Sequence, residues 1–189
     1  CQKQLENVLI KLVSYWLEKT GQKNICFAGG VALNGKVNGG LANMEKVNNF
    51  YTNWCSNDSG ISLGAAILSS KSSAQNWTSS NAFSGRSFSN EDVEKQLLEV
   101  GLHFTKTENP FLELQNLIQQ NKIVGFFNGK SEFGPRSLGN RSIFANPFQP
   151  NIQSILNKKI KSRDSFRPFG IILRQKDLPI YFETKVEYS

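Results

Sequence analysis

The sequence predicts an α/β fold in two parts. In the first 70 residues, apolar side chains alternate between helical and strand spacing, which is typical of an α/β layer. From Lys71 to Ser89 the composition changes to Ser, Asn, Gly and Gln, which is typical of a linker. Strand and helix patterns then return, and 189 residues suffice for two small domains. We therefore predict domains at 1–70 and 89–189, joined by a linker at 71–88.

The first part begins with a helix whose apolar residues follow the i, i+3, i+4, i+7 pattern, and Gly21 marks its end. A short apolar run then leads into Gly29-Gly30, a turn that precedes the next helical pattern. The predicted elements, in order, are helix 5–17, strand 24–28, helix 33–44, strand 50–55 and helix 61–68. Helices and strands thus alternate throughout this part.

The second part begins at Ser89, which has Asp92 three residues later, as in a capping box. We predict α/β or α+β structure for this part. The predicted elements are a helix from Ser89 to Leu102, helix 111–120, strand 122–127, loop 128–141, a strand at 142–145, helix 151–159 and an apolar run at 169–173.

Positive charge is concentrated in one segment. The net charge is +7, but residues 121–176 hold eleven Lys and Arg against two acids, whereas the remainder is slightly acidic. Such a segment is expected to meet phosphates, although a solvated basic face has the same composition. The three cysteines show no paired spacing, and no apolar run approaches the ~18–20 residues of a membrane span. We therefore expect a cytoplasmic protein with no membrane partner.

Two positions in the first part could carry chemistry. Gly29-Gly30 lies between a strand and a helix, where backbone N–H groups can face a phosphate, although a tight structural turn is the better explanation of the glycine pair taken alone. Asp58 follows a predicted strand, from which a carboxylate can reach a metal, although it could simply cap a helix. The single histidine, His103, is assigned no role.

Two irregular segments in the second part combine Gly, Pro and Arg. The first runs from Gly129 to Ser142 and the second from Lys161 to Phe169. Glycine and proline fix the backbone, while arginine supplies planar donors that match phosphate and carboxylate oxygens. The alternative is a pair of ordered loops held by hydrogen bonds from arginine to the backbone.

Four strings carry a family resemblance: AGGVALN at 28–34, NDSGISLGAA at 57–66, GKSEFGPRSLGNRSIFANP at 129–147 and KSRDSFRPFGIIL at 161–173. In this order and spacing, the chain resembles the C-terminal part of the NodU/CmcH/TobZ carbamoyltransferase family. The resemblance implies the C-terminal portion of an actin-like domain followed by a YrdC-like domain. In that family the YrdC-like domain makes carbamoyl adenylate from ATP and carbamoyl phosphate, and the actin-like domain passes the carbamoyl group to a hydroxyl of a small molecule.

The resemblance also implies roles for individual residues. It assigns nucleotide contact to Gly29, Gly30 and Asn34, and it places the basic positions of the YrdC-like motifs at Lys130, Arg136, Arg141, Arg163 and Arg167. Asp58 matches an aspartate that completes a site for a divalent metal, iron or magnesium, whose His-x-x-x-His ligands precede this chain. The family often has glycine where this chain has Asn57, which bears on the turn before Asp58. We expect a chain truncated at both ends and inactive by itself.

Two alternatives remain. A nucleic-acid-binding module would use the basic segment, with Phe126, Phe127 and Phe133 stacking on bases. Adjacent strand residues face opposite sides, however, so we expect at least one of Phe126 and Phe127 in the core. A protein of tRNA threonylcarbamoylation is the other alternative, but the order of the two parts resembles the small-molecule branch. We therefore expect no nucleic-acid partner.

Overall fold

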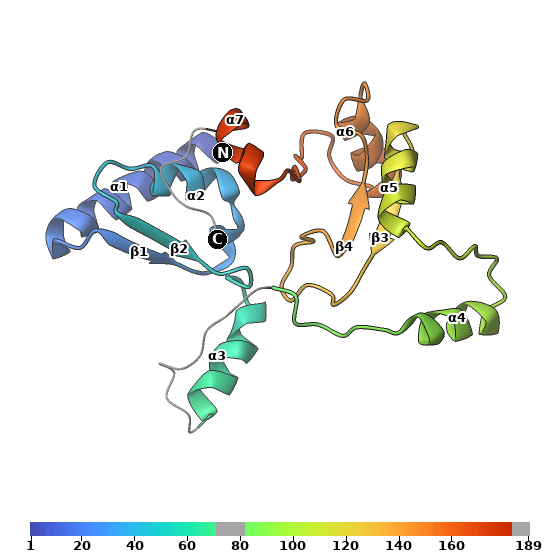
Figure 1. The fold of residues 1–189 in the computed structure, drawn as a ribbon. Coiled ribbons are helices and arrows are strands. Elements are labelled where there is room, and N and C mark those ends of the chain that lie inside the picture. Colours follow the sequence, from blue (N-terminus) through green and yellow to red (C-terminus); the bar gives the residue numbers. More distant parts are fainter. Residues whose placement is uncertain (71–81, 183–189) are drawn as a thin grey trace. The chain divides into compact units, whose positions relative to one another are not determined.

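The computed structural model describes residues 1–70 and 82–182, which form two compact units (Figure 1). The first unit holds the described residues of Cys1–Ala82, together with Phe133–Arg136 and the chain from Leu173 onward; the second holds Phe83–Glu132 and Ser137–Ile172. Both units mix helices and strands, which confirms the predicted α/β class. The predicted domain boundaries stay a prediction, and the linker residues 71–81 lie outside the described residues.

Two parallel strands form the sheet of the first unit. Its elements are α1 (Gln2–Thr20), β1 (Asn24–Phe27), a 3₁₀ helix (Gly30–Leu33), α2 (Gly35–Ala42), β2 (Asn49–Thr52) and α3 (Ser59–Ser69). Asn24 pairs with Asn49, and Phe27 pairs with Thr52. Because the strands run in the same direction, both end at one edge of the sheet, and the loops that follow them emerge there. Ligands of open α/β sheets bind at this type of edge.

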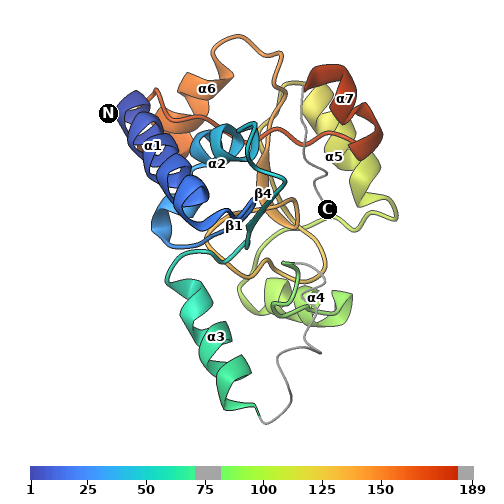
Figure 2. The ribbon, with the colours of Figure 1, turned by 90° about the vertical axis from the view of Figure 1, so that its left-hand side faces the viewer.

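The core of the first unit lies between α1, α2 and β2. Leu17 of α1 is buried, as are Val37 and Leu41 of α2, and Leu41 is fully enclosed. Helix α2 contacts both α1 and β2, so it links the outer helix to the sheet. Helix α3 contributes no buried residue, and both ribbon views show it extending away from the β1–β2 sheet (Figures 1 and 2).

The second unit is built around an antiparallel hairpin. Its elements are α4 (Asn90–Glu99), α5 (Pro110–Gln119), β3 (Val124–Phe127), β4 (Arg141–Phe144), α6 (Ile152–Ile155) and a π-helical turn (Leu156–Ile160). Ser89 and Asp92 form the predicted capping box at the start of α4. The predicted strand at 142–145 begins one residue earlier, and the predicted helix at 151–159 divides into α6 and the π-helical turn.

Phe126 and Phe127 lie on opposite sides of β3, as strand geometry requires. The Phe126 ring lies 5.7 Å from the rings of both Phe111 on α5 and Phe144 on β4. Phe127 is half exposed, and the centroid of its ring lies 6.2 Å from the centroid of the Phe88 ring. Phe126 therefore packs inside this unit, which removes one of the three aromatic residues that a nucleic-acid surface would need.

The chain ends its described part in short helical turns of the first unit, namely a 3₁₀ helix (Gln175–Asp177) and α7 (Leu178–Tyr181). The apolar run at 169–173 forms neither helix nor strand. No helix within residues 1–70 and 82–182 has the length and apolar content needed to cross a membrane.

Candidate functional site

The loop after β1 lies at the carboxyl edge of the first unit's sheet. Gly29 adopts φ +100°, a conformation that favours glycine, and its N–H donates to the carbonyl of Ser56 at 2.7 Å. This bond ties the loop after β1 to the loop after β2. Within the described residues, the N–H groups of Gly30 and Val31 have no hydrogen-bond partner. Of the predicted glycine pair, Gly30 rather than Gly29 therefore has its N–H available to an anion.

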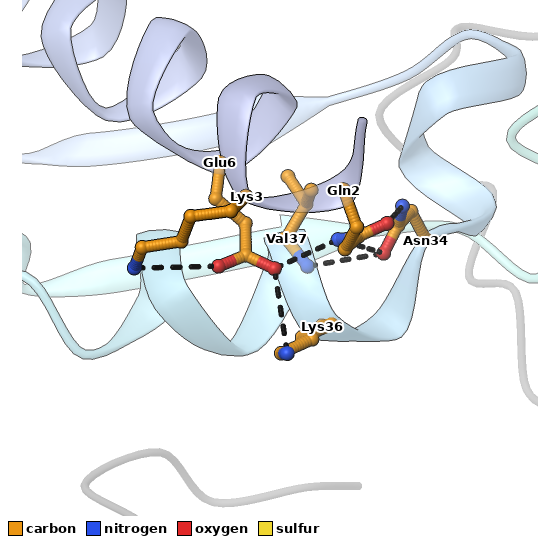
Figure 3. A network of polar contacts seen from close by, with 6 residues as sticks. All are labelled: Gln2, Lys3, Glu6, Asn34, Lys36 and Val37. Carbon is orange, nitrogen blue, oxygen red and sulfur yellow. Dashed lines mark hydrogen bonds and ion pairs between the residues drawn. The ribbon is translucent and has the colours of Figure 1, made fainter.

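Asn34 closes this loop by capping α2. Its Oδ1 accepts the N–H of Val37 at 3.2 Å, and its amide exchanges hydrogen bonds with the amide of Gln2 on α1 (Figure 3). Figure 3 also shows Glu6 between Lys3 and Lys36, with each ion pair at 3.8 Å. Both polar atoms of the Asn34 side chain thus have protein partners. Its predicted contact with a nucleotide stays a prediction.

Asp58 lies at the same edge, at the N-cap position of α3. Its side chain is exposed and makes no capping hydrogen bond. Asp58 lies within a turn that begins at Asn57, whose carbonyl accepts the N–H of Gly60 and whose Oδ1 accepts the hydroxyl of Ser59. The effect of having Asn57 where the resemblance implies glycine stays a prediction. Within the described residues, no three His, Cys, Asp or Glu side chains gather into a metal site, so Asp58 offers one oxygen ligand.

Three buried polar side-chain groups at the end of β2 have no hydrogen-bond partner among residues 1–70 and 82–182. They are the hydroxyl of Thr52, the indole N–H of Trp54 and the hydroxyl of Ser56. Most buried polar groups in proteins are paired, so unpaired ones need an explanation. All three lie beside the loops of the candidate edge.

The segment Phe133–Arg136 joins this edge from far along the chain. Gly134 adopts φ +106°, and a Cβ there would lie 2.8 Å from the carbonyl oxygen of Trp54, so a glycine is required for this approach. Two residues later, Nη2 of Arg136 donates to the carbonyl of Leu33 at 3.4 Å. The structure thus places Arg136 with the loop of Gly29, Gly30 and Asn34.

Glu132 organises the loop between β3 and β4 in the second unit. Its side chain is buried, and Oε1 accepts the N–H groups of Leu138, Asn140 and Arg141 at 2.7, 2.9 and 3.1 Å. Burial, the largest single influence, raises the pKa of Glu132, but the surrounding backbone N–H groups together bring that pKa below its ordinary value. The carboxylate is therefore ionised and acts as an internal anion around which the loop folds.

Lys130 and Arg141 flank this loop. The carbonyl of Lys130 accepts the side-chain amide of Asn140 at 2.8 Å, so the hydrogen bond connects the two ends of the loop. Nε of Arg141 lies 4.0 Å from Oε2 of Glu132, and the Arg141 side chain is about half exposed. Arg141 thus has a nearby countercharge while its guanidinium stays accessible to an anion.

Arg163 and Arg167 lie on one loop that buried Asn157 clamps. The amide of Asn157 donates to the carbonyls of Ser165 and Arg167 at 3.1 and 2.9 Å, and its Oδ1 accepts Nε of Arg163 at 2.7 Å. Arg163 also lies over the ring of Phe169. Within the described residues, the guanidinium of Arg167 has no partner. Arg163 therefore holds the loop, whereas Arg167 is free to bind a ligand.

An open hollow of about 620 Å³ lies on this loop in the second unit, lined by Lys158, Ser162, Arg163, Asp164 and Ser165. Ser162 has φ +47°, which is uncommon for a residue other than glycine. Its wall carries two basic side chains, Lys158 and Arg163, and one acidic side chain, Asp164.

Sequence reasoning did not identify Glu132, Asn157 or Ser56. Glu132 carried a signal, because it is one of two acids among eleven basic residues in its segment. Asn157 and Ser56 carried none, since their importance comes from burial and from partners distant in the chain.

Comparisons with known proteins match both ends of the chain to carbamoyltransferases. A family model described as "Carbamoyltransferase N-terminus" matches residues 1–67, and one described as "Carbamoyltransferase C-terminus" matches residues 115–189. An uncharacterised Synechocystis protein, sll1178, is 34% identical over 94% of this chain and 31% of its own length. Nodulation protein NolNO of Sinorhizobium fredii is 31% identical, over 96% of this chain and 28% of its own length. Nodulation protein U of the same species is 33% identical, over 86% of this chain and 28% of its own length.

The fold and the site define an α/β protein whose ordered loops carry arginines. The two family models together match most of the chain, in the order of the two halves. The chain belongs to the NodU-type carbamoyltransferase family. It spans about a third of the length of the curated relatives it matches.

Proposed function

We propose that the chain is part of an O-carbamoyltransferase that uses ATP and carbamoyl phosphate. The observation that carries the proposal is the succession of an N-terminal and a C-terminal carbamoyltransferase match on a chain whose arginines lie on ordered loops. In this proposal the first half belongs to an actin-like domain and the second to a YrdC-like domain. We place the protein in the cytoplasm, because the proposed reaction uses ATP and because Cys1, Cys26 and Cys55 form no disulfide.

The second unit is proposed to make the carbamoyl adenylate. Carbamoyl phosphate loses its phosphate to water, and an oxygen of the resulting carbamate attacks the α-phosphorus of ATP, releasing pyrophosphate. These reactants bring many negative charges together, so the site must neutralise them and align the attacking oxygen. Three cationic side chains of this unit are assigned contact with the reactants, namely Lys130, Arg141 and Arg167, and Arg163 is assigned the positioning of the loop that carries Arg167.

The first unit is proposed to carry out the transfer. The hydroxyl oxygen of a small-molecule acceptor attacks the carbamoyl carbon, its proton leaves, and AMP departs with the bonding electrons. The names of two relatives refer to nodulation, but the acceptor of this protein is defined here only as a hydroxyl compound.

A divalent metal, iron or magnesium, is proposed to bind at the edge of the first unit. The fit is partial, because the exposed Asp58 carboxylate supplies one oxygen ligand and no second acidic or histidine ligand clusters with it in the described residues. Asp58 would hold one coordination position, and the metal would polarise the group that it binds.

The test is carbamoyl-phosphate-dependent release of pyrophosphate from ATP by the full-length protein. We expect release that requires both substrates and a carbamoyl adenylate that mass spectrometry detects. A folded protein that releases no pyrophosphate, but binds oligonucleotides with a steep salt dependence, would instead support the nucleic-acid alternative.

A further inference from the structure

The two carboxylate oxygens of Glu132 have different surroundings. Oε1 accepts three backbone N–H groups of the loop between β3 and β4. Oε2 is buried and has no hydrogen-bond partner within residues 1–70 and 82–182, and the cationic atom beside it is Nε of Arg141, at 4.0 Å. Buried polar atoms are normally paired, so the unpaired Oε2 needs an explanation. Oε1 thus holds the backbone, whereas Oε2 faces an arginine side chain.

Arg141 is held at its base and free at its tip. Its backbone N–H donates to Oε1 of Glu132 at 3.1 Å, and its Nε lies beside Oε2. In the part of the chain that the structure describes, its guanidinium makes no hydrogen bond, and the side chain is 53% exposed. The two terminal Nη groups therefore remain available. They can bind a phosphate through two parallel hydrogen bonds.

We infer that Glu132 is a positioning residue, which orients the guanidinium of Arg141 so that its Nη groups meet a phosphate group of the reactants. The inference rests on the proposed function, which supplies the phosphate. Ordering a long side chain costs free energy when a ligand binds. Because the attraction between Oε2 and Nε restricts Arg141 before the ligand arrives, Glu132 reduces this cost.

The length of the ion pair leaves Arg141 usable. At 4.0 Å the two charges attract each other, but no hydrogen bond occupies Nε. The charge of Glu132 is already shared among the N–H groups of Leu138, Asn140 and Arg141. A closer, bidentate ion pair would occupy the guanidinium and compete with the phosphate. Glu132 can therefore orient Arg141 without using its donors.

The charge of Glu132 by itself predicts the opposite effect on phosphate binding. A carboxylate beside an anion-binding arginine repels the anion, so its replacement by a neutral amide should tighten binding. If Glu132 positions Arg141, the same replacement should weaken binding, because the amide that keeps Oε1 in place turns an N–H₂ donor toward the donor Nε. The sign of the change therefore separates positioning from simple repulsion.

The experiment measures the binding of inorganic pyrophosphate, a product of the proposed reaction, to the full-length protein by calorimetric titration. It compares the parent, Glu132→Gln, Arg141→Ala and the double variant in a double-mutant cycle. The control is Glu113→Gln, the same substitution at an exposed carboxylate of α5 in the same unit. Circular dichroism checks that each variant is folded.

We expect Arg141→Ala to weaken pyrophosphate binding by about 10- to 150-fold, because charge-assisted hydrogen bonds are lost. Glu132→Gln should weaken it by about 2- to 12-fold, the cost of ordering one long side chain. In the Arg141→Ala background, Glu132→Gln should cause no further weakening, and Glu113→Gln should match the parent. A merely structural role for Glu132 would weaken binding equally in both backgrounds.

Several results would overturn the inference: equal weakening in both backgrounds, tighter binding by Glu132→Gln, or a parent or an Arg141→Ala variant that shows no pyrophosphate binding attributable to Arg141. Arg141→Lys tests the same relationship if Glu132→Gln does not fold. Lysine keeps the charge but has no Nε opposite Oε2, so this variant should bind pyrophosphate more weakly than the parent. Parent-like affinity in Arg141→Lys would also overturn the inference.

Turnover separates this inference from the proposed function. If the parent binds pyrophosphate but does not release it from ATP, the proposed function fails, and the double-mutant cycle still decides whether Glu132 orients Arg141. If the parent turns over ATP but Glu132→Gln binds and releases pyrophosphate as the parent does, the proposed function stands and the role of Glu132 is wrong.

Discussion

The carboxylate of Glu132 accepts the backbone N–H of Leu138 at 2.7 Å, the shortest of the three N–H contacts that gather on its Oε1. The loop between β3 and β4 is therefore folded around a buried negative charge. Strand β4 begins at Arg141, directly after this loop, so the carboxylate of Glu132 also fixes the position at which β4 begins.

Glu132→Gln should lower the free energy of unfolding by about 1–3 kcal/mol, because hydrogen bonds to a charged acceptor are stronger than those to a neutral amide. The effect should depend on pH. The pKa of Glu132 is lower in the folded state, so its contribution is full above the unfolded pKa of about 4.3 and is lost as pH falls through the folded pKa. Thermal unfolding at pH 7 and at lower pH measures this difference.

The control for this prediction is Glu45→Gln, which removes an exposed carboxylate of the first unit. It should change stability by no more than about 0.5 kcal/mol at either pH. Equal effects of the two substitutions would mean that Glu132 does not organise the loop.

Asn157→Ala should destabilise the second unit by about 1–3 kcal/mol, because the buried amide holds two carbonyls and Nε of Arg163. Gln153 is the matched control, since it donates to the same carbonyls of Ser165 and Arg167 from an exposed position. Gln153→Ala should cost only about 0.5 kcal/mol. Hydrogen exchange over residues 161–169 should rise in the first variant, and an unchanged rate would argue against the clamp.

Gly134→Ala should destabilise the first unit by about 1–3 kcal/mol from its positive φ alone, and the close carbonyl of Trp54 adds to this cost. Gly40→Ala, in the interior of α2 with open space around it, should instead stabilise by about 0.5–1 kcal/mol. Urea unfolding compares the two variants. If both change stability in the same direction and by the same amount, the packing of Gly134 on Trp54 is wrong.

Arg167→Ala should abolish pyrophosphate release by the full-length protein while leaving its fold intact, because the free guanidinium serves no structural contact. Its backbone carbonyl, which Asn157 holds, is unaffected by the substitution. The control is Lys106→Ala, an exposed cation of the second unit that pairs with Glu94. Near-normal release in the Arg167 variant would remove this residue from the adenylate-forming site.

Periodic and local signals predicted much of the fold. The apolar spacing of residues 5–17 predicted helix α1, and Ser89 with Asp92 predicted the start of α4. The alternation of side chains along a strand predicted that Phe126 and Phe127 face opposite sides. Each of these features is decided within a few residues, so a single sequence is enough to show it.

Long-range packing could not be predicted in the same way. The bond from Arg136 to Leu33 joins residues 103 positions apart, and it depends on Gly134 fitting against Trp54. Similarly, the spacing of the arginines did not show that Arg163 is held by Asn157 while Arg167 is free. The sequence could therefore predict which arginines belong to the candidate site. Only the structure showed which of them makes structural contacts and which has a guanidinium available to a ligand.

Asp58→Asn should lower the divalent metal bound per full-length chain and leave carbamoyl-phosphate-dependent pyrophosphate release unchanged. An amide keeps the shape of the carboxylate but loses the charge that holds a hard or borderline cation. Stability should change little, because Asp58 makes no capping hydrogen bond and asparagine suits the N-cap position equally. Elemental analysis measures the metal, with Asp177→Asn as the control for an acid of the same unit that pairs with Arg174. If the Asp58 variant retains its metal, Asp58 is not a ligand; if pyrophosphate release falls with the metal, the two half-reactions are not divided between the units as proposed.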